Sequence, residues 1–387
     1  MKPPNPLLAA AGTTIFEAMS ELARAHAAVN LGQGFPDEPG PLALRQAAAT
    51  ATLDGPHQYP PMMGTPALRQ AVAAHDLRRH GTALDWQTEV LVTSGATEAL
   101  LVTFLGLLAP GDEVVVLEPA YDTYAPVIRR LGAVPVAVRL TPPTWELPVD
   151  ELAAACSPRT KALVLNNPMN PTGKVFTDAE LERLAALVVA HDAYLIADEV
   201  YEHLVFAGRR HRSALSLPGL RERAVRIGSA GKTFSLTGWK VGYVSAAPAL
   251  LHPIAKAHQL TTFTTPPSLQ HAVALGLDEV EQHTAGLADR LARSRDRLAA
   301  GLTALGLPLL PVDGTYFQVA DVAAWMRPDE DDVAFARRLV VDAGVVVIPM
   351  SAFYAADAPR SLVRFCFCKH DATIDAALER LTTWARR

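Results

Sequence analysis

The chain has 387 residues, half of them hydrophobic, and a formal net charge of −5 at neutral pH. That length and hydrophobicity are sufficient for a large core and predict two domains, or one large α/β domain with an appendage. Because the balance is acidic and the sequence contains no basic run, we expect no nucleic-acid partner. The longest apolar stretch, around residues 99–109, is far too short to span a bilayer, so we expect no membrane partner either.

The cysteines and histidines suggest neither a disulfide framework nor a metal site. Three cysteines cannot all pair with one another, and Cys366 and Cys368 alternate within an apparent strand, which places both thiols on one face. We interpret them as reduced, packed residues of a cytoplasmic protein. The apolar stretch Leu7–Ala11 is too short for a secretion signal. The histidines are dispersed and form no His-Glu-x-x-His motif, so the sequence predicts no metal ligands.

The N-terminal part of the chain contains two predicted helices and two glycine-rich turns. The first helix begins at Thr14, with Glu17 three places on as a capping box, and ends near His26. The second begins at Thr65, which is followed by a proline, and ends at Gly81. The two turns are Asn30–Asp37 and Gln58–Gly64.

Short apolar runs alternate with helical patterns through the middle of the chain. Continuous apolar strands separated by helices are typical of an α/β fold, in which helices cover both faces of a mainly parallel sheet. Seven such runs predict a seven-stranded sheet, and they are Val90–Val92, Val114–Leu117, Val134–Val138, Ala162–Leu165, Tyr194–Ala197, Val225–Ile227 and Val241–Val244.

The pattern changes after this middle region. Long helices rich in alanine and leucine occupy most of residues 248–304, and from Leu305 onward short strands mix with two helices. We expect those strands at Gly314–Phe317, Val345–Ile348 and Leu362–Phe365. The chain is therefore predicted to have a large domain over residues 46–290 and a small α+β domain over residues 291–387, which an N-terminal arm over residues 1–45 joins.

Lys232 is the most informative single residue, because it follows a buried strand that ends near Ile227. It lies just past a strand's carboxyl end, where open α/β sheets bind their ligands. A lysine in such a partly dry place loses solvation, so its amine is more easily neutral and nucleophilic, as Schiff-base chemistry requires. Three other motifs that this segment resembles are incomplete. A P-loop needs glycine where Arg226 stands, and the Ser229-x-x-Lys232 pair lacks the companion motifs of penicillin-recognising enzymes. Gly228-Ser229-Ala230-Gly231 lacks the spacer residue of a nucleophile elbow.

Four more strand ends carry unusual groups. After the first strand, Ser94–Glu98 opens a helix whose backbone N–H groups form a seat for phosphate. Tyr121 places an aromatic ring at the end of the next strand. Two Asn-Pro steps within Asn166–Gly173 form a rigid turn that fixes the side chain of Asn170. Asp198 ends an apolar strand with a carboxylate that needs a cationic partner, and a protonated heterocycle would supply one.

Together these motifs resemble one family of enzymes. The residues that carry the resemblance are Ser94-Gly95-Ala96-Thr97, Asn170-Pro171-Thr172-Gly173, Asp198-Glu199-Val200-Tyr201, Ser229-x-x-Lys232 and Gly238-Trp239-Lys240-Val241-Gly242. In order and spacing they are similar to the fold-type-I, class I aminotransferases that depend on pyridoxal 5'-phosphate, over nearly the whole chain. Asn30–Asp37 and Arg364-Phe365-Cys366-Phe367 resemble the branch that contains bacterial methionine aminotransferase, kynurenine aminotransferase and some N-succinyldiaminopimelate aminotransferases.

The resemblance implies a homodimer that binds pyridoxal 5'-phosphate and assigns roles to particular residues. Lys232 would hold the cofactor covalently and then transfer a proton. Asp198 would pair with its pyridine nitrogen, and Tyr201 and Asn170 would hydrogen-bond its phenolic oxygen. Tyr121 would stack on its ring. The phosphate would be bound by Ala96, Thr97, Ser229, Lys240 and, from the second subunit, Tyr59.

The substrates that the resemblance implies are amino acids and 2-oxo acids, which bind in turn in a ping-pong scheme. Arg364 would clamp the substrate carboxylate, helped by Asn170 and the amide of Gly34. An apolar, aromatic pocket would favour a neutral or aromatic donor such as methionine, phenylalanine, tyrosine, leucine or glutamine. The residues expected to line it are Phe16, Phe263 and Tyr316.

Several other activities stay open. Kynurenine is a less expected donor, because Thr264 stands where that branch has a histidine, and no second arginine for a distal carboxylate can be identified for N-succinyldiaminopimelate. A β-lyase acting on cysteine S-conjugates would use the same residues but expel a leaving group from Cβ. A third possibility is a regulatory protein that keeps a vestigial enzyme fold. The presence of every group that the chemistry needs argues against it.

Overall fold

A computed structural model describes residues 2, 5, 9, 12–206 and 208–386 of the chain. The chain forms two compact units. The large unit comprises Glu38–Arg290 and Asp313–Thr315, and the small unit comprises Met1–Asp37, Leu291–Val312 and Tyr316–Arg387. None of the helices in the described part of the chain combines the length and apolar character that a membrane span requires.

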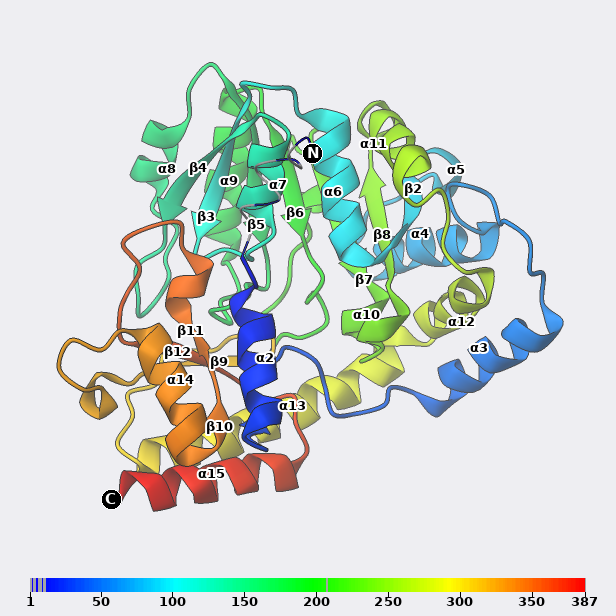
Figure 1. The fold of residues 1–387 in the computed structure, drawn as a ribbon. Coiled ribbons are helices and arrows are strands. Elements are labelled where there is room, and N and C mark those ends of the chain that lie inside the picture. The colour runs from blue at the N-terminus through cyan, green and yellow to red at the C-terminus, as the bar shows by residue number, and fades with distance from the viewer. Residues whose placement is uncertain (1, 3–4, 6–8, 10–11, 207, 387) are drawn as a thin grey trace. The chain divides into compact units, whose positions relative to one another are not determined.

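The large unit is built on a seven-stranded sheet with the order β2-β8-β7-β6-β5-β3-β4 (Figure 1). β8 runs antiparallel to both β2 and β7, and the other neighbouring strands are parallel. The predicted mainly parallel, seven-stranded sheet is therefore confirmed. The strands are β2 (Val90–Ser94), β3 (Glu113–Glu118), β4 (Val134–Arg139), β5 (Thr160–Asn166), β6 (Tyr194–Asp198), β7 (Ala224–Ser229) and β8 (Val241–Ala246).

Helices flank this sheet. α6 packs against β2, β7 and β8, α4 against β2, and α9 against β6, and Figure 1 shows α6 and α7 in front of the strands. The helices are α3 (Leu42–Asp54), α4 (Pro66–His80), α5 (Trp86–Glu89), α6 (Gly95–Leu107), α7 (Tyr124–Arg130), α8 (Val149–Ala155), α9 (Asp178–Ala190), α10 (Ala230–Thr233), α11 (Pro248–Thr261) and α12 (Pro267–Asp278), with 3-10 turns η1 (Ala214–Ser216) and η2 (Thr237–Trp239). The ends predicted for α4 are confirmed, because the Thr65 side chain accepts a hydrogen bond from the Leu68 amide and Gly81 has a left-handed conformation.

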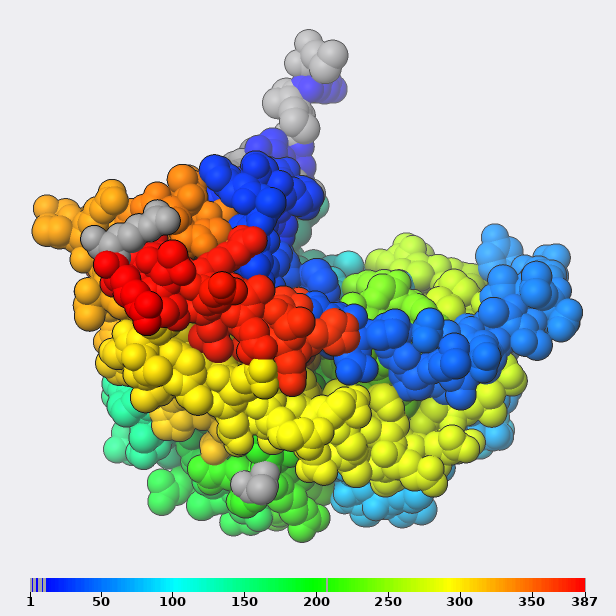
Figure 2. Space-filling view, turned by 90° about the horizontal axis from the view of Figure 1, so that it is seen from below, coloured from blue at the N-terminus to red at the C-terminus, as the bar shows by residue number. Residues whose placement is uncertain are grey.

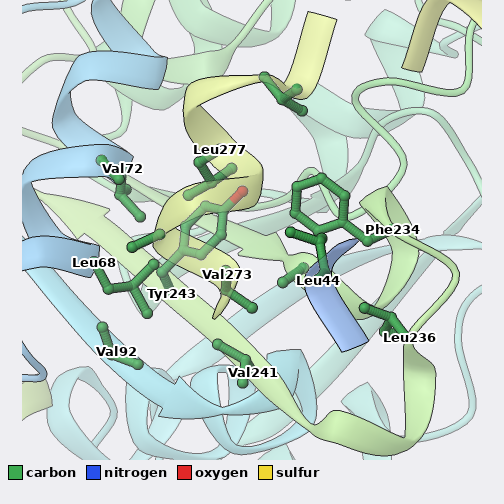
Figure 3. Packing of buried hydrophobic residues seen from close by; sticks show 14 of the residues in the cluster. Leu44, Leu68, Val72, Val92, Phe234, Leu236, Val241, Tyr243, Val273 and Leu277 are labelled. Carbon is green, nitrogen blue, oxygen red and sulfur yellow. The ribbon is translucent and has the colours of Figure 1, made fainter. Parts of the chain in front are cut away.

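A cluster of buried apolar side chains joins α3, α4 and α12 to β2 and β8 (Figure 3). The ring of Tyr243 lies within this cluster, and a Cβ at Gly228 on β7 would come within 2.1 Å of that ring. Gly228 therefore leaves the space that the ring fills, since close-packed interiors tolerate little added volume. This packing fixes β7 and β8, whose ends carry Ser229 and Lys240.

The small unit contains two short sheets, one with the parallel pair β1-β10 and one with the antiparallel order β11-β12-β9. The predicted first helix is confirmed as α2, which begins after Thr14, and the Thr14 hydroxyl accepts a hydrogen bond from the Glu17 amide. The elements are α2 (Ile15–Ala25), β1 (Val29–Asn30), β9 (Phe317–Asp321), η3 (Ala323–Trp325), α14 (Asp332–Ala343), β10 (Val345–Val346), β11 (Ile348–Pro349), η4 (Met350–Phe353), β12 (Leu362–Cys366) and α15 (Asp371–Ala385).

The long helix α13 (Val280–Ala304) carries the chain from the large unit into the small one. In the small unit its C-terminal part lies beside α15, which Figure 2 shows as the red surface next to the yellow one. Arg297 of α13 donates two hydrogen bonds to Asp375 of α15, at 2.6 and 2.5 Å. A Cβ added at Gly301 of α13 would lie 2.5 Å from the Leu378 side chain of α15, so the two helices pack closely at this glycine.

Two predicted strands need correction. We expected one strand at Val345–Ile348, but the chain forms two there, β10 (Val345–Val346) and β11 (Ile348–Pro349), which belong to different sheets. We expected a strand at Gly314–Phe317, but β9 begins only at Phe317. Gly314 and Thr315 belong instead to the large unit, where their amides donate to the carbonyls of Gly173 and Leu204 at 2.8 and 2.7 Å. Because these contacts join segments far apart in sequence, the local apolar pattern could not predict them.

Candidate active site

The polar groups predicted at strand ends of the large unit share one edge of its sheet. The strand registers place Ser94 opposite Val241, Ser229 opposite Gly242, and Asn166 opposite Asp198. Because β8 is antiparallel to β2 and β7, its N-terminal end lies beside the carboxyl ends of those strands. Lys240, just before β8, therefore lies at the same edge, where parallel sheets bind ligands.

Asp198 ends β6 as a buried carboxyl group. The hydroxyl of Tyr124 donates to its Oδ2 at 2.5 Å, and the amide of Val200 donates to its Oδ1 at 3.4 Å. Burial raises the pKa of Asp198 to about 6, although these two donors and the nearby charge of Lys232 oppose the rise. The carboxyl group is thus placed where a cation would stabilise its ionised form.

Tyr124 is a contact of Asp198 that we did not predict from the sequence. It is the first residue of α7 and is fully buried, and burial raises the pKa of its phenol well above the ordinary value. The hydroxyl therefore keeps its proton and acts as a donor. The available signal was weak, since it consists of a second tyrosine three places after Tyr121 in a segment that follows a strand.

Lys232 lies in the short helix α10, directly after β7. Its Nζ is 5.5 Å from the centre of the Tyr201 ring. Its charge also contributes to lowering the pKa of Asp198, so the two groups are close enough to interact. The structure therefore brings together the three residues for which we predicted catalytic roles.

The start of α6 and the start of β8 form a tightly packed corner. Lys240 Nζ lies 3.1 Å from the hydroxyl of Thr97. Gly95 has a positive φ of 71°, and a Cβ there would lie 3.2 Å from Lys240 Cε. A Cβ at Gly242 would lie 2.5 Å from the carbonyl carbon of Gly95 and 2.7 Å from the amide nitrogen of Ala96. The N-terminal amides of the 13-residue helix α6 and the side chain of Lys240 therefore lie together, as an anion-binding site requires.

We expect Gly242→Ala to lower the free energy of unfolding by about 1–3 kcal/mol, because the added methyl group collides with backbone atoms that cannot rotate away. Urea denaturation measures this change. Gly238→Ala is the matched control, since a Cβ at Gly238 meets no atom within 4 Å. Equal stability of the two variants would contradict the close approach of β8 to α6.

Asn170 and Tyr121 lie in loops that the same edge supports. The amide of Asn170 donates to Asn166 Oδ1 at 2.7 Å, and Asn166 Nδ2 in turn donates to the carbonyl of Asp198 at 2.9 Å. The Tyr121 ring lies 5.7 Å from the ring of Tyr124. Burial raises the pKa of Tyr121, and the charge of Asp198 adds to that rise. Both loops are thus tied to the surroundings of Asp198.

Tyr59 and Phe263 form a separate aromatic pair in the large unit. Their rings are 5.8 Å apart and meet edge to face. Tyr59 is 83% exposed and Phe263 is 40% exposed, which is unusual for large aromatic side chains. Phe263 also has a positive φ of 68°, a backbone conformation that bulky residues rarely adopt. A strained, exposed aromatic pair of this kind is typical of a binding surface.

Within the small unit, Arg364 is buried in the middle of β12. Its NH2 group donates to the carbonyl of Gly32 at 2.7 Å. Its guanidinium carbon lies 4.0 Å from the centre of the Phe317 ring, 5.1 Å from that of Phe353 and 5.5 Å from that of Phe16. Aromatic faces hold a guanidinium plane in one orientation without neutralising its charge.

Gly34 and Tyr316 belong to the same group of residues. The hydroxyl of Tyr316 donates to the carbonyl of Gly34 at 2.8 Å. A Cβ at Gly34 would lie 3.0 Å from the Phe317 ring that also stacks on Arg364. Four predicted substrate-binding residues therefore lie close together in the small unit, namely Phe16, Gly34, Tyr316 and Arg364.

The large unit also contains a buried cluster of charged side chains that we did not predict from the sequence. Arg226 on β7 is fully buried and pairs with Asp76, Glu199 and Glu202 at 3.0, 3.0 and 2.6 Å. Although burial opposes ionisation, the charge of Arg226 holds the pKa of Glu202 well below its ordinary value. Burial lowers the pKa of His203 well below the ordinary value, so its imidazole is neutral. The sequence did not reveal this cluster, because its members come from α4, the loop after β6, and β7.

Comparison with known proteins gives a consistent result. The sequence model of the family described as "Aminotransferase class I and II" matches residues 27–381. The chain is 45% identical to a probable N-succinyldiaminopimelate aminotransferase of Mycobacterium tuberculosis, over 97% of each chain. It is 39% identical to kynurenine–oxoglutarate transaminase 1 of Rattus norvegicus, over 94% of each chain. The crystal structure of a methionine aminotransferase from Escherichia coli superimposes with a TM-score of 0.95 at 41% identity, covering 99% of this chain and 100% of that one.

These matches confirm the predicted branch, fold and enzyme class, because all three proteins are aminotransferases and the likeness extends over nearly the whole chain. Class I aminotransferases of this kind use pyridoxal 5'-phosphate, and their substrates are amino acids and 2-oxo acids. The chain belongs to the class I and II aminotransferase family and is a pyridoxal-phosphate-dependent enzyme of the α/β fold that this family shares.

Proposed function

We propose that this enzyme transfers the amino group of a neutral or aromatic L-amino acid to a 2-oxo acid, with the strand-end residues of the large unit as its cofactor site. The fit of those residues to pyridoxal 5'-phosphate supports the proposal. The buried carboxyl of Asp198, whose pKa burial raises to about 6, suits a protonated pyridine nitrogen. The corner formed by Gly95, Ala96 and Lys240 suits a phosphate group.

When bound, the cofactor supplies an electron sink for the bonds at the substrate's α-carbon. The chain's residues supply the rest of the chemistry. Lys232 removes the proton from the α-carbon and returns a proton to the product side, because its amine is the basic group at the end of β7. Asp198, held by the Tyr124 hydroxyl at 2.5 Å, would stabilise a positive charge at the pyridine nitrogen. Tyr121, Tyr201 and Asn170 would orient the ring, and Ser229 and Thr97 would belong to the phosphate site.

In the small unit, we propose that Arg364 binds the substrate carboxylate together with the amide of Gly34. The observation that carries the substrate proposal is the aromatic surrounding of this arginine, with the ring of Phe317 at 4.0 Å and those of Phe353 and Phe16 at 5.1 and 5.5 Å. Such surroundings accept an apolar or aromatic side chain more readily than a second charge. Methionine, phenylalanine, tyrosine, leucine and glutamine are therefore the proposed donors, and Tyr316 is proposed to line the side-chain pocket in the small unit.

Replacement of Arg364 by lysine is expected to raise KM for the amino donor by about 10- to 100-fold, because lysine loses the bidentate fork and its stacking on Phe317. Steady-state kinetics with a fixed 2-oxo acid measures the effect. Arg297→Lys is the matched control, since Arg297 is an exposed residue whose partner is Asp375. A KM for Arg364→Lys equal to that of the control would refute the role of Arg364.

A second candidate substrate is N-succinyldiaminopimelate, which the 45% identity to the M. tuberculosis protein favours. A panel of donors, measured as relative kcat/KM with several 2-oxo acids, separates the two candidates. We expect the neutral and aromatic amino acids to exceed N-succinyldiaminopimelate. A reversed order would overturn the substrate proposal while leaving the enzyme class intact. Kynurenine and a cysteine S-conjugate belong in the same panel, and pyruvate formed without any 2-oxo acid would reveal β-lyase activity.

We also propose that the enzyme is a homodimer in which Tyr59 reaches the phosphate of the partner's site. The exposure of Tyr59 and Phe263, at 83% and 40%, supports this proposal, because aromatic side chains this exposed are typical of interfaces. Tyr59→Phe is expected to weaken cofactor binding, measured by dialysis and absorbance, without changing the sedimentation coefficient. A fully active monomer in sedimentation would contradict the shared site.

A further inference from the structure

We propose that the buried cluster beside the active site holds a zinc-type divalent metal ion, bound by His75, Glu202 and His203. All three residues belong to the large unit, and their side chains are almost completely buried. One donor atom from each residue lies within 4.8 Å of the donor atoms of the other two. Two imidazoles and one carboxylate are donors that zinc accepts in proteins.

The spacing of the donors fits such an ion. His75 Nε2 lies 3.2 Å from Glu202 Oε2. Two donors that bind one zinc ion at 2.0–2.1 Å with tetrahedral geometry stand about 3.3 Å apart. His80 Nε2 is 2.7 Å from the same oxygen, so a further imidazole stands beside the position that a fourth ligand would take. The third donor atom, on His203, lies within 4.8 Å of the donors of His75 and Glu202.

The hydrogen bonds of His203 leave one of its nitrogens available. Its Nδ1 lies 3.3 Å from the hydroxyl of Thr233, whereas its Nε2 is buried and, among the described residues, has no hydrogen-bond partner. A metal-binding histidine commonly uses one nitrogen for the ion and the other for a hydrogen bond that fixes the ring. A bound ion would give this buried nitrogen of His203 the partner that it lacks among the described residues.

The charges of the cluster also favour a bound cation. Asp76, Glu199 and Glu202 surround Arg226, whose side chain is fully buried. Arg79, with Nε 3.9 Å from Glu202, is the second guanidinium nearby and is 28% exposed. Three carboxylates thus outnumber two guanidinium groups, and buried carboxylates require compensation by positive charge. A divalent ion supplies that compensation together with the missing partner of His203.

The second His-Glu-His group of the cluster is a weaker site. His80, Glu199 and His211 also lie within 4.8 Å of one another. However, Glu199 Oε2 is 3.0 Å from Arg226 Nε, and the Arg226 NH2 group is 3.5 Å from His80 Nε2. The Glu199 oxygen that contacts His211 is thus the same oxygen that pairs with Arg226. Glu202 also pairs with Arg226, at 2.6 Å, but through Oε1, whereas its contacts with His75 and His80 are through Oε2. In the second group a positive guanidinium therefore already occupies the carboxylate oxygen that a metal ion would need, which opposes binding of the ion. We therefore assign the ion to His75, Glu202 and His203.

An ion in this place would be structural and would support the active site. His203 contacts Thr233, the residue after Lys232, and Glu202 follows Tyr201. The ion would therefore tie α4 to the segment after β6 and, through His203, to α10. Structural metal sites contribute their binding free energy to folding. The expected consequence is a holoenzyme whose unfolding temperature rises with zinc and falls after chelation.

The test measures metal in the untagged holoenzyme after dialysis against Zn²⁺ and then against metal-free buffer. Elemental mass spectrometry should find about one zinc ion per chain in the wild type and only traces in His203→Gln. His211→Gln, which alters the second group only, should retain the ion. The unfolding temperature of the wild type and of His211→Gln should rise with Zn²⁺, and that of His203→Gln should not.

A crystal of the wild-type holoenzyme gives an independent result if His203→Gln fails to fold. Anomalous scattering at the zinc absorption edge should show a peak between His75, Glu202 and His203. Wild-type enzyme without zinc and without such a peak would overturn the proposal. Full retention of zinc by His203→Gln, or its loss from His211→Gln alone, would also overturn the assignment.

Discussion

Lys232→Ala should lower kcat by about 10⁴-fold or more, because the variant loses both the covalent anchor of the cofactor and the base at the end of β7. The fold should persist, since Lys232 lies in a one-turn helix and its side chain is partly exposed rather than part of the core. Single-turnover absorbance measurements with an amino donor and circular dichroism of the same samples test both expectations.

The control for this substitution is Lys256→Ala. Lys256 is an exposed residue of α11, and its Nζ contacts only Gln259 among the hydrogen bonds of the described residues. Its replacement should leave kcat unchanged. If Lys232→Ala retained activity comparable to that of this control, another residue would have to act as the base, and the assignment of Lys232 would be wrong.

Asp198→Asn should have opposite effects on activity and on stability. The amide no longer stabilises a protonated pyridine nitrogen, so kcat should fall by about 10²-fold or more. The cofactor-free protein, in contrast, should become more stable at pH 8. The folded-state pKa of Asp198 is raised from 3.8 to about 6, and keeping that carboxyl ionised in the fold therefore costs about 3 kcal/mol.

The pH dependence of this gain has a definite sign. Above pH 6 the carboxyl is ionised in the folded and unfolded states, and the full destabilisation is present. As the pH falls from about 6 toward 3.8, the folded state takes up its proton first, and the destabilisation disappears. Urea denaturation of the apoprotein at pH 8 and pH 4 should therefore show a gain only at pH 8. Asp289→Asn, at an exposed site on α13, is the control, and an equal change in both variants would contradict the buried charge.

Most of the large unit could be predicted, because its strands are continuous apolar runs and their ends carry recognisable groups. Each of the seven runs corresponds to a strand, and Asp198 and Ser229 do end β6 and β7. The resemblance of short motifs in the correct order supplied the family, which the comparisons confirm. The roles of individual site residues, the dimer and the cytoplasmic setting stay predictions.

The rest depends on contacts between distant segments, which leave no local pattern. Tyr124 becomes a partner of Asp198 only because α7 places it there, 74 residues away in sequence. The dispersed histidines suggested no metal site, yet His75 and His203 lie with tilted rings 5.0 Å apart. In the sequence, Arg226 looks like an ordinary strand residue, because its partner Asp76 lies 150 residues earlier.

Borohydride reduction of the holoenzyme, followed by tryptic digestion and mass spectrometry, tests most directly whether the cofactor is bound by Lys232. Trypsin cleaves after Arg226 and Lys240, but it cannot cleave after a modified Lys232. The cofactor's mass should therefore appear on the single peptide Ile227–Lys240, with the modified residue at Lys232. The same label on Lys240 or on any other lysine, or a digest without label from a yellow, active enzyme, would contradict the site described above.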